Sequence, residues 1–199
     1  MFDKYDALIF DMDGTIVDSG QLHEAAWTKT LQHYNIPVQP DLMRSLAGVP
    51  TIETINILIK HFKCTVNETA IQMNDFKESF VKKEAFRFVK PTTLINVAKK
   101  YHGKKPMAIG TGAYSQEAKS IIEICKMSHL FNHIVGADKV ISPKPSPDTF
   151  LKCAELMGAS PDKCIVFEDS KIGIQAAKAA GMDVIDVYES YGIENQYYL

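Results

Sequence analysis

Short apolar runs alternate with helical patterns along much of this chain. The runs that predict strands are Ala7–Phe10, Met107–Ile109, His133–Val135, Ile165–Phe167 and Val184–Val187. Between most of them, apolar residues recur at the three- and four-residue spacing of an amphipathic helix, as in 94–101, 118–125 and 150–157. Alternating strands and helices are typical of βαβ units. We therefore expect an α/β fold with a doubly wound parallel sheet.

One long stretch departs from this alternation, because from about residue 16 to residue 88 the pattern is almost wholly helical. Its expected helices are Gln21–Tyr34, Thr51–Phe62 and Asn67–Phe88, the last with Asn67 as its N-cap. A helical block directly after the first strand predicts an inserted subdomain. We expect a helical cap of residues 16–88 and a core domain made of residues 1–15 and 89–199.

Composition and charge exclude several classes of protein. The chain has 199 residues, of which 46% are hydrophobic, enough for a full globular core. Its 22 basic and 24 acidic residues give a net charge of −2, which argues against a nucleic-acid partner. No apolar stretch approaches the roughly 20 residues that span a bilayer, so we expect no membrane association.

The N-terminus and the cysteines indicate the cytoplasm. No basic segment precedes Ala7–Phe10, and this run is too short for the apolar region of an export signal. The cysteines Cys64, Cys125, Cys153 and Cys164 are scattered without a CxxC pair, so we expect free thiols in a reducing compartment. A monomer is the expected state.

The polar residues that follow the predicted strands are the candidates for chemistry. In open parallel sheets, ligands bind beyond the carboxyl ends of the strands. The residues expected there are Asp11 and Asp13 after the first strand, Thr111 and Gly112 after the second, Lys144 beyond the third, and Glu168 and Asp169 after the fourth. We expect this edge to carry several carboxylates, a hydroxyl group and an ammonium group.

Carboxylates gathered at one edge need a cation. Two of them 4 Å apart repel by about 4 kcal/mol at an effective dielectric constant of 20. Oxygen ligands without His or Cys favour Mg²⁺ over zinc. With Mg²⁺ and Lys144 present, a phosphate dianion becomes a suitable ligand.

The spacing of the two aspartates suggests a division of work between them. Asp11 ends its strand, where its carboxylate could attack phosphorus and form an aspartyl-phosphate. Asp13 follows two residues later, before Gly14 allows a sharp turn, and could act as general acid and then as general base. Thr111 and the Gly112 amide suit phosphate oxygens.

Taken together, these motifs resemble those of the haloacid dehalogenase superfamily, in the branch with an inserted helical cap. The match rests on Asp11-x-Asp13-Gly14-Thr15, Thr111, Lys144 within Lys-Pro-x-Pro-Asp, and Glu168-Asp169 before 173–177. The resemblance implies that Asp11 is the nucleophile and a Mg²⁺ ligand. It implies that Asp13 is the acid and base and offers its carbonyl to the metal. Asp169 would bind the metal with Glu168 close by, and Thr111, Gly112 and Lys144 would hold the phosphoryl group.

Within this branch, the chain is most similar to the β-phosphoglucomutase-like group and its fructose-1-phosphate phosphatase members. The mutases have a cap segment of the type Leu-Lys-Gly-Val-Ser-Arg, whereas here Leu46–Thr51 reads Leu-Ala-Gly-Val-Pro-Thr, without either basic residue. Arg44 is offset from these positions. A mutase must hold a second phosphate, so the segment favours hydrolysis of small sugar phosphates over interconversion of β-glucose 1-phosphate and glucose 6-phosphate. His23 matches a histidine at the cap edge of this group, a candidate for substrate contact or gating, although its i, i+4 spacing with Trp27 also suits packing.

Two non-enzymatic interpretations stay open. Receiver domains of signalling proteins also combine acidic residues, Mg²⁺, a threonine and a lysine on a parallel sheet. They usually place the phosphoacceptor after a middle strand and have no helical insert near the N-terminus, unlike this chain. A catalytically silent phosphate-binding relative is disfavoured because every motif residue is present. Catalytic turnover distinguishes an enzyme from both.

Overall fold

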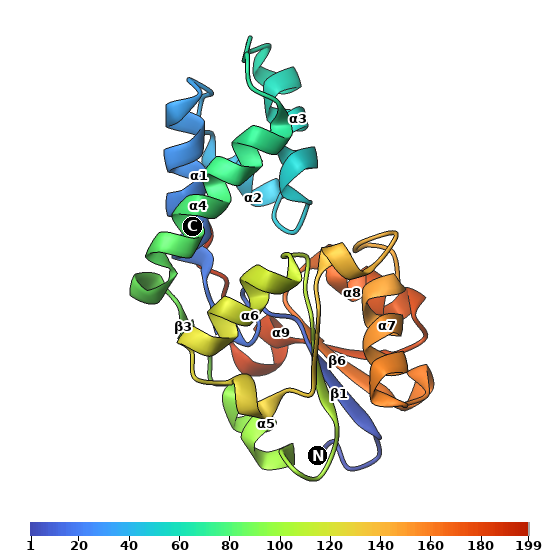
Figure 1. Ribbon diagram of the computed structural model, residues 1–199. Helices are drawn as coiled ribbons and strands as arrows, with labels where there is room; N and C mark the ends of the chain where they lie inside the picture. The colour runs from blue at the N-terminus through green and yellow to red at the C-terminus, as the bar shows by residue number, and fades with distance from the viewer. Residues whose placement is uncertain (199) are drawn as a thin grey trace.

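The computed structural model describes residues 1–198, and a parallel sheet forms its centre (Figure 1). The strand order is β5-β4-β1-β6-β7, and every neighbouring pair is parallel. The strands are β1 (Ala7–Phe10), β4 (Met107–Gly110), β5 (His133–Val135), β6 (Cys164–Glu168) and β7 (Asp183–Asp186). Each strand overlaps a predicted one, with ends that differ by at most one residue. β7 ends at Asp186 rather than Val187, because Val187 begins a helix that Asp186 caps.

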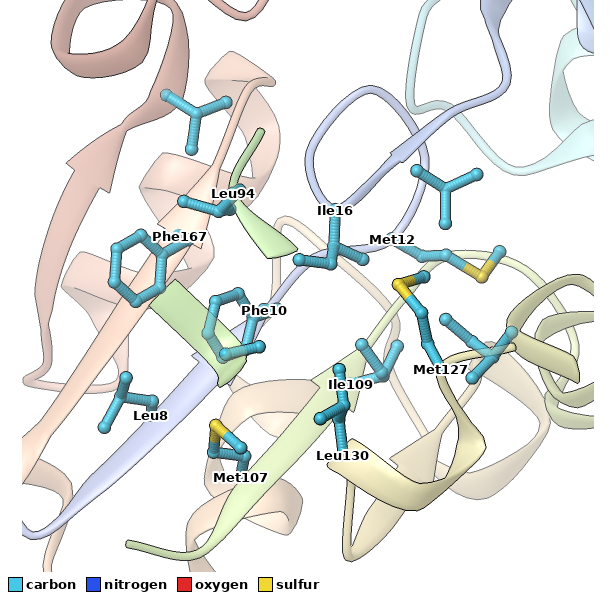
Figure 2. Close-up of a cluster of buried hydrophobic side chains, with 14 of the residues drawn as sticks. Leu8, Phe10, Met12, Ile16, Leu94, Met107, Ile109, Met127, Leu130 and Phe167 are labelled. Atoms are coloured by element: carbon cyan, nitrogen blue, oxygen red, sulfur yellow. The ribbon is translucent and has the colours of Figure 1, made fainter. Parts of the chain in front are cut away.

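Helices cover both faces of the sheet, which confirms the doubly wound α/β fold. One face packs against α5 (Ile95–Tyr101), α6 (Ser115–Ile124) and α9 (Val187–Tyr191), and the other packs against α7 (Asp148–Met157) and α8 (Lys171–Ala179). Figure 2 shows the first of these cores, in which the rings of Phe10 and Phe167 stack with centroids 4.7 Å apart. Burial on both faces explains why the strands are continuously apolar. Short 3₁₀ helices occur at Ser128–Leu130, Ala137–Lys139 and Pro161–Lys163.

The helical block between β2 and β3 has apolar cores of its own. Its helices are α1 (Gly20–His33), α2 (Pro40–Ser45), α3 (Thr51–Phe62) and α4 (Ala70–Phe88), and Figure 1 shows them together at one end of the molecule. Trp27, Leu31 and Leu58 are among the buried side chains that hold them together. The short helix α2 was not among the predicted elements.

The start of α4 corrects one prediction. The helix begins at Ala70, and its N-cap is Thr69 rather than Asn67. The Thr69 hydroxyl accepts from the backbone N–H of Gln72, and the Gln72 side chain accepts from the N–H of Thr69 at 2.9 Å. This reciprocal capping box satisfies two N–H groups, which Asn67 would not do from its position.

Two short strands connect the helical block to the sheet region. β2 (Val17–Asp18) and β3 (Lys90–Pro91) pair in an antiparallel manner, and Lys90 lies 3.2 Å from the Asp18 carboxylate. The C-terminal segment also returns to the helices, because Tyr198 packs among them and its backbone N–H donates to Glu24 at 3.0 Å. Sequence patterns predicted neither contact.

Two further predictions concern the chain as a whole. The four cysteines are free thiols, as expected. Among residues 1–198 there is no helix of the length and hydrophobicity needed to cross a membrane.

Candidate active site

A pocket lies between the carboxyl ends of the central strands and the helical block. Its lining includes every site residue predicted from the sequence: Asp11, Asp13, His23, Thr111, Gly112, Lys144, Glu168 and Asp169. The residues at the ends of β1, β4 and β6 come together because β4 and β6 flank β1, so the carboxyl ends of all three strands meet at one edge. Residues of α1, α4 and the segment between α2 and α3 form the opposite wall.

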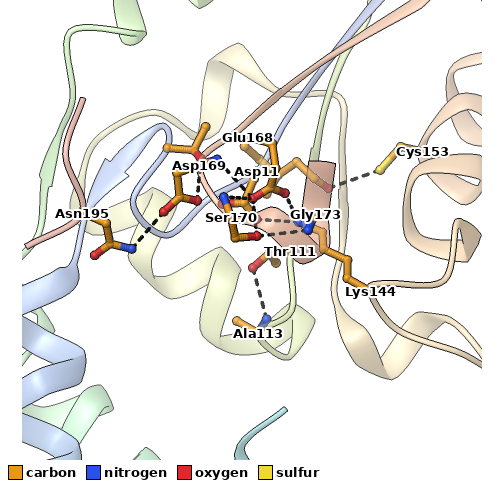
Figure 3. Close-up of polar contacts among 12 residues, drawn as sticks. Asp11, Thr111, Ala113, Lys144, Cys153, Glu168, Asp169, Ser170, Gly173 and Asn195 are labelled. Atoms are coloured by element: carbon orange, nitrogen blue, oxygen red, sulfur yellow. Dashed lines mark hydrogen bonds and ion pairs between the residues drawn. The ribbon is translucent and has the colours of Figure 1, made fainter. Parts of the chain in front are cut away.

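Lys144 is the buried cation of this pocket. Its Nζ atom lies 2.7 Å from Oδ1 of Asp11 and 2.7 Å from Oε2 of Glu168 (Figure 3). Burial by itself lowers the pKa of Lys144, but the two carboxylates outweigh it and hold this pKa above its usual value. The ammonium group therefore stays charged beside Asp11.

Asp11, Glu168 and Asp169 form a carboxylate cluster. One oxygen from each lies within 4.8 Å of the others. Burial and the charge of Glu168 raise the pKa of Asp11 well above its ordinary range, and the same two causes raise that of Asp169 to about 7. Lys144 alone therefore leaves the cluster short of positive charge. An oxygen-only donor set with excess negative charge fits Mg²⁺.

Neighbouring polar groups hold these carboxylates in place. Oε1 of Glu168 accepts from the Ser170 hydroxyl at 2.9 Å and from two backbone N–H groups. Asp169 accepts from the Thr15 hydroxyl at 3.2 Å and from the Asn195 amide at 3.0 Å. Ser170 carries a sequence signal, because it precedes α8 as an N-cap. No local pattern could have pointed to Asn195.

Two glycines allow this close approach. A Cβ atom at Gly173 would lie 2.0 Å from Oε2 of Glu168, so only glycine fits there. Gly14 has a φ of +78°, and a Cβ atom there would lie 2.3 Å from Oδ2 of Asp169. The predicted turn at Gly14 is confirmed, and it carries the chain away from β1 directly beside the cluster.

Asp13 faces the helical block rather than the carboxylate cluster. Its Oδ1 atom accepts from the Ser19 hydroxyl at 2.6 Å and lies 3.0 Å from Nε2 of His23. Burial opposes ionisation of Asp13, but His23 and Ser19 outweigh it and hold its pKa below the usual value. His23 thus contacts a site residue, in addition to lying on the same helix as the buried Trp27, whereas Ser19 was not predicted.

Thr111 and Gly112 lie at the start of the loop after β4. The Thr111 side chain is buried, and its hydroxyl oxygen accepts from the N–H of Ala113 at 3.1 Å (Figure 3). Gly112 is exposed to the pocket. A Cβ atom at Gly112 would meet nothing within 4 Å, so the space beside this backbone is open.

The wall of the pocket formed by the helical block carries little free positive charge. Leu46–Thr51 lines it without a basic side chain, and Arg44 instead pairs with Asp41. The basic side chains that line this side among the described residues are His23, which lies 3.0 Å from Asp13, and Lys77, which lies 3.0 Å from Glu78.

This combination of sheet, inserted helices and acidic edge agrees with the family comparison. The sequence model of the haloacid dehalogenase-like hydrolase family matches residues 8–187, and the chain therefore belongs to this family. The chain is 41% identical to the fructose-1-phosphate phosphatase YqaB of Escherichia coli over 94% of this chain and 98% of that protein. It is 30% identical to the β-phosphoglucomutase of Bacillus subtilis over 91% of this chain and 82% of that protein.

A solved structure supports the fold. The crystal structure of CbbY from Rhodobacter sphaeroides in complex with phosphate superposes with a TM-score of 0.78 at 22% identity, covering 90% of this chain and 84% of that one. The resemblance predicted from the motifs is thereby confirmed at the level of the family and the fold.

Proposed function

We propose that this chain is a Mg²⁺-dependent phosphatase of small sugar phosphates, and that its preferred substrates are esters like fructose 1-phosphate. The observation that carries the proposal is the position of Asp11, which lies 2.7 Å from the Lys144 ammonium within a cluster of three carboxylates. The 41% identity to the fructose-1-phosphate phosphatase of Escherichia coli supports the choice of substrate.

Asp11 is the proposed nucleophile. It lies directly after β1 and lines the pocket, where its carboxylate would attack phosphorus and release the sugar alcohol, leaving an aspartyl-phosphate. Lys144, the Thr111 hydroxyl and the Gly112 amide would hold the phosphoryl oxygens.

Asp13 is the proposed acid and base. Ser19 and His23 favour its carboxylate form, which is the form that takes a proton from water in the second step. For the first step it must be protonated, and the negative charge of an arriving phosphate ester favours that protonation. The proton then passes from Asp13 to the ester oxygen as the bond to phosphorus breaks.

The residues proposed to hold Mg²⁺ are Asp11, Glu168 and Asp169, together with the backbone carbonyl of Asp13. The first three supply the oxygen atoms of the cluster. When bound, the ion would supply the positive charge that offsets the three carboxylates and the phosphoryl oxygens. Thr15 and Asn195 would orient Asp169 through their hydrogen bonds.

Hydrolysis fits the pocket better than the mutase reaction. A mutase must bind a bisphosphate, which needs a second cationic site on the cap side. Among the described lining residues, the basic side chains other than Lys144 are His23 and Lys77, and each already lies about 3.0 Å from a carboxylate. Arg44 is paired with Asp41 and does not line the pocket.

The helical block is the proposed cap over this pocket. We propose that residues 16–88 close on the substrate and exclude bulk water from the first step, with residues 1–15 and 89–199 as the core. The antiparallel pair of β2 and β3 lies where both connections cross between the two parts. His23 would then contact the substrate or gate its entry from the cap edge. A monomer in the cytoplasm stays the prediction.

A phosphate-release panel tests this proposal. The purified chain is given fructose 1-phosphate, glucose 6-phosphate and β-glucose 1-phosphate, each with Mg²⁺ or with EDTA, and inorganic phosphate is measured. We expect turnover that requires Mg²⁺ and favours fructose 1-phosphate. In a second assay with β-glucose 1-phosphate and a trace of the bisphosphate, glucose 6-phosphate forming faster than free phosphate would reverse the choice of hydrolase over mutase.

A further inference from the structure

A second acidic pair lies in the pocket, away from the carboxylate cluster. Glu78 comes from α4 in the helical block and Glu117 from α6 in the sheet region, and these two helices contact each other. Lys77 is buried beside them, 3.0 Å from Glu78 and with its ammonium 5.5 Å from the centre of the Trp27 ring. None of these three residues is used in the proposed chemistry.

Glu117 has an oxygen without a partner. Its Oε1 atom is shielded from solvent and makes no hydrogen bond to any described residue. An acidic residue in the first turn of a helix ordinarily stays in water or accepts from the first N–H groups, and Glu117 makes no such bond. Leaving a buried acceptor unpaired costs about 1–3 kcal/mol, so such an atom usually has a partner in the working protein, for example a water molecule, an ion or a ligand.

The neighbours of Glu117 set its charge state. Burial, and then the charge of Glu78, raise the pKa of Glu117 well above its usual value. Burial opposes ionisation of Glu78 as well, but the charge of Lys77 and a hydrogen bond with the Glu117 carboxyl group outweigh it and lower the pKa of Glu78. These opposite shifts in pKa favour the neutral form for Glu117 and the charged form for Glu78. A neutral carboxyl group can accept a hydrogen bond without repelling a phosphate dianion in the same pocket.

The position of Glu117 places this acceptor on the leaving-group side. α6 begins directly after the loop that carries Thr111 and Gly112, the proposed phosphate ligands. The charge of Asp13, the residue proposed to protonate the leaving oxygen, also contributes to the raised pKa of Glu117. Glu117, Asp11 and Asp13 all line this pocket, so a sugar ester whose phosphate lies at Asp11 could reach Glu117 with its hydroxyl groups.

We propose that Glu117 is a specificity-determining residue whose Oε1 atom accepts a hydrogen bond from a hydroxyl group of the leaving alcohol. It selects polyhydroxylated phosphate esters over esters without hydroxyl groups, because only the former satisfy this oxygen. The inference rests on the proposed function, since it concerns the same pocket and the same phosphate position.

Two esters and three variants test this role. Fructose 1-phosphate carries hydroxyl groups that phenyl phosphate lacks. For Glu117→Leu, we expect the ratio of kcat/KM for fructose 1-phosphate to that for phenyl phosphate to fall about 5- to 100-fold. Glu117→Gln keeps a neutral carbonyl oxygen, so it should restore the ratio to within about 3-fold of wild type. Glu123→Leu, on the exposed side of the same helix, should leave the ratio unchanged.

The inference is overturned if Glu117→Leu keeps the wild-type ratio, or if Glu117→Gln loses as much as Glu117→Leu. Glu117→Met carries the same test if the leucine variant does not fold. Calorimetry in the Asp11→Asn background measures the affinity for fructose 1-phosphate without turnover. An inactive wild-type enzyme would refute the proposed function. An unchanged affinity on adding Glu117→Leu would refute the role of Glu117 separately.

Discussion

The Nζ atom of Lys144 lies 2.7 Å from Oδ1 of Asp11, although the two residues are 133 positions apart in the chain. Both side chains are buried, with 6% and 8% of their surfaces exposed. Removing either partner of a charge pair this deeply buried leaves the other charge buried without compensation, which is strongly unfavourable for folding. The contact therefore connects the stability of the core to the chemistry of the site.

Replacing Lys144 should expose this connection. Lys144→Met leaves Asp11 and Glu168 buried without a cation, so we expect the free energy of unfolding to fall by about 3–5 kcal/mol and phosphatase activity to be lost. Urea denaturation in EDTA measures the first effect and phosphate release the second. Lys139→Met, at an exposed lysine in the same region, is the matched control. Equal stability of the two variants would show that the pair contributes nothing.

Asp13→Asn should separate the two chemical steps. A phosphate ester with a very good leaving group, such as 2,4-dinitrophenyl phosphate, needs no acid in the first step but still needs a base in the second. We expect a burst of about one equivalent of dinitrophenol followed by turnover slowed about 10²- to 10⁴-fold. Stopped-flow absorbance records the burst. Steady turnover at the wild-type rate, with no burst, is the result that this role of Asp13 does not allow.

Removal of the metal should lower stability through the carboxylate cluster. An ion bound only by the folded protein stabilises it by about 2.7 kcal/mol at a concentration 100 times its Kd. We therefore expect Mg²⁺ to raise the Tm of the wild type and EDTA to reverse this. Asp169→Asn should lose most of the increase, because it removes one of the three ligand oxygens. Asp75→Asn, at an exposed position on α4, should keep it.

A Tm of Asp169→Asn that still rises with Mg²⁺ as in the wild type would place the ion elsewhere. The same outcome with Asp11→Asn would remove the cluster from consideration as the metal site.

The raised pKa of Glu117 predicts a pH-dependent effect on stability. A carboxyl group whose pKa is higher in the folded state binds more protons there, so its contribution is lost as pH rises from its unfolded value of about 4.5 through the folded one. Glu117→Gln cannot titrate. Its free energy of unfolding, relative to wild type, should therefore increase between pH 5 and pH 8. Urea denaturation at both values checks this.

The surrounding charges that shape this titration are Glu78, Lys77 and Asp13. Glu78 and Glu117 shift each other's pKa, so the comparison reports the titration of this coupled pair. A difference between variant and wild type that stays constant from pH 5 to pH 8 would mean that Glu117 is ionised throughout this range.

Much of the site could be predicted because it depends on strand ends. Apolar runs define β1, β4 and β6, and in a parallel sheet their carboxyl ends must meet at one edge, which places Asp11, Thr111 and Glu168 together. Lys144 follows no strand directly. Its motif within a proline-rich loop, rather than any periodicity, pointed to it.

The remaining features arise from contacts that no local pattern encodes. Asn195 reaches Asp169 across 26 positions, and Tyr198 reaches Glu24 across 174. Glu117 has the sequence signature of an ordinary acid in the first turn of a helix, and only its burial distinguishes it. The N-cap of α4 was misplaced because Asn67 and Thr69 are both good caps, and the reciprocal bonds with Gln72 decide between them.

The phosphorylation of Asp11 itself is the most direct test of the account. Wild-type protein turning over fructose 1-phosphate with Mg²⁺ is quenched in acid, reduced with borohydride to convert any aspartyl-phosphate to homoserine, and mapped by mass spectrometry. The account predicts homoserine at position 11 during turnover and none in the Asp11→Asn variant. Homoserine at any other aspartate, or steady phosphate release with no modified residue, would contradict it.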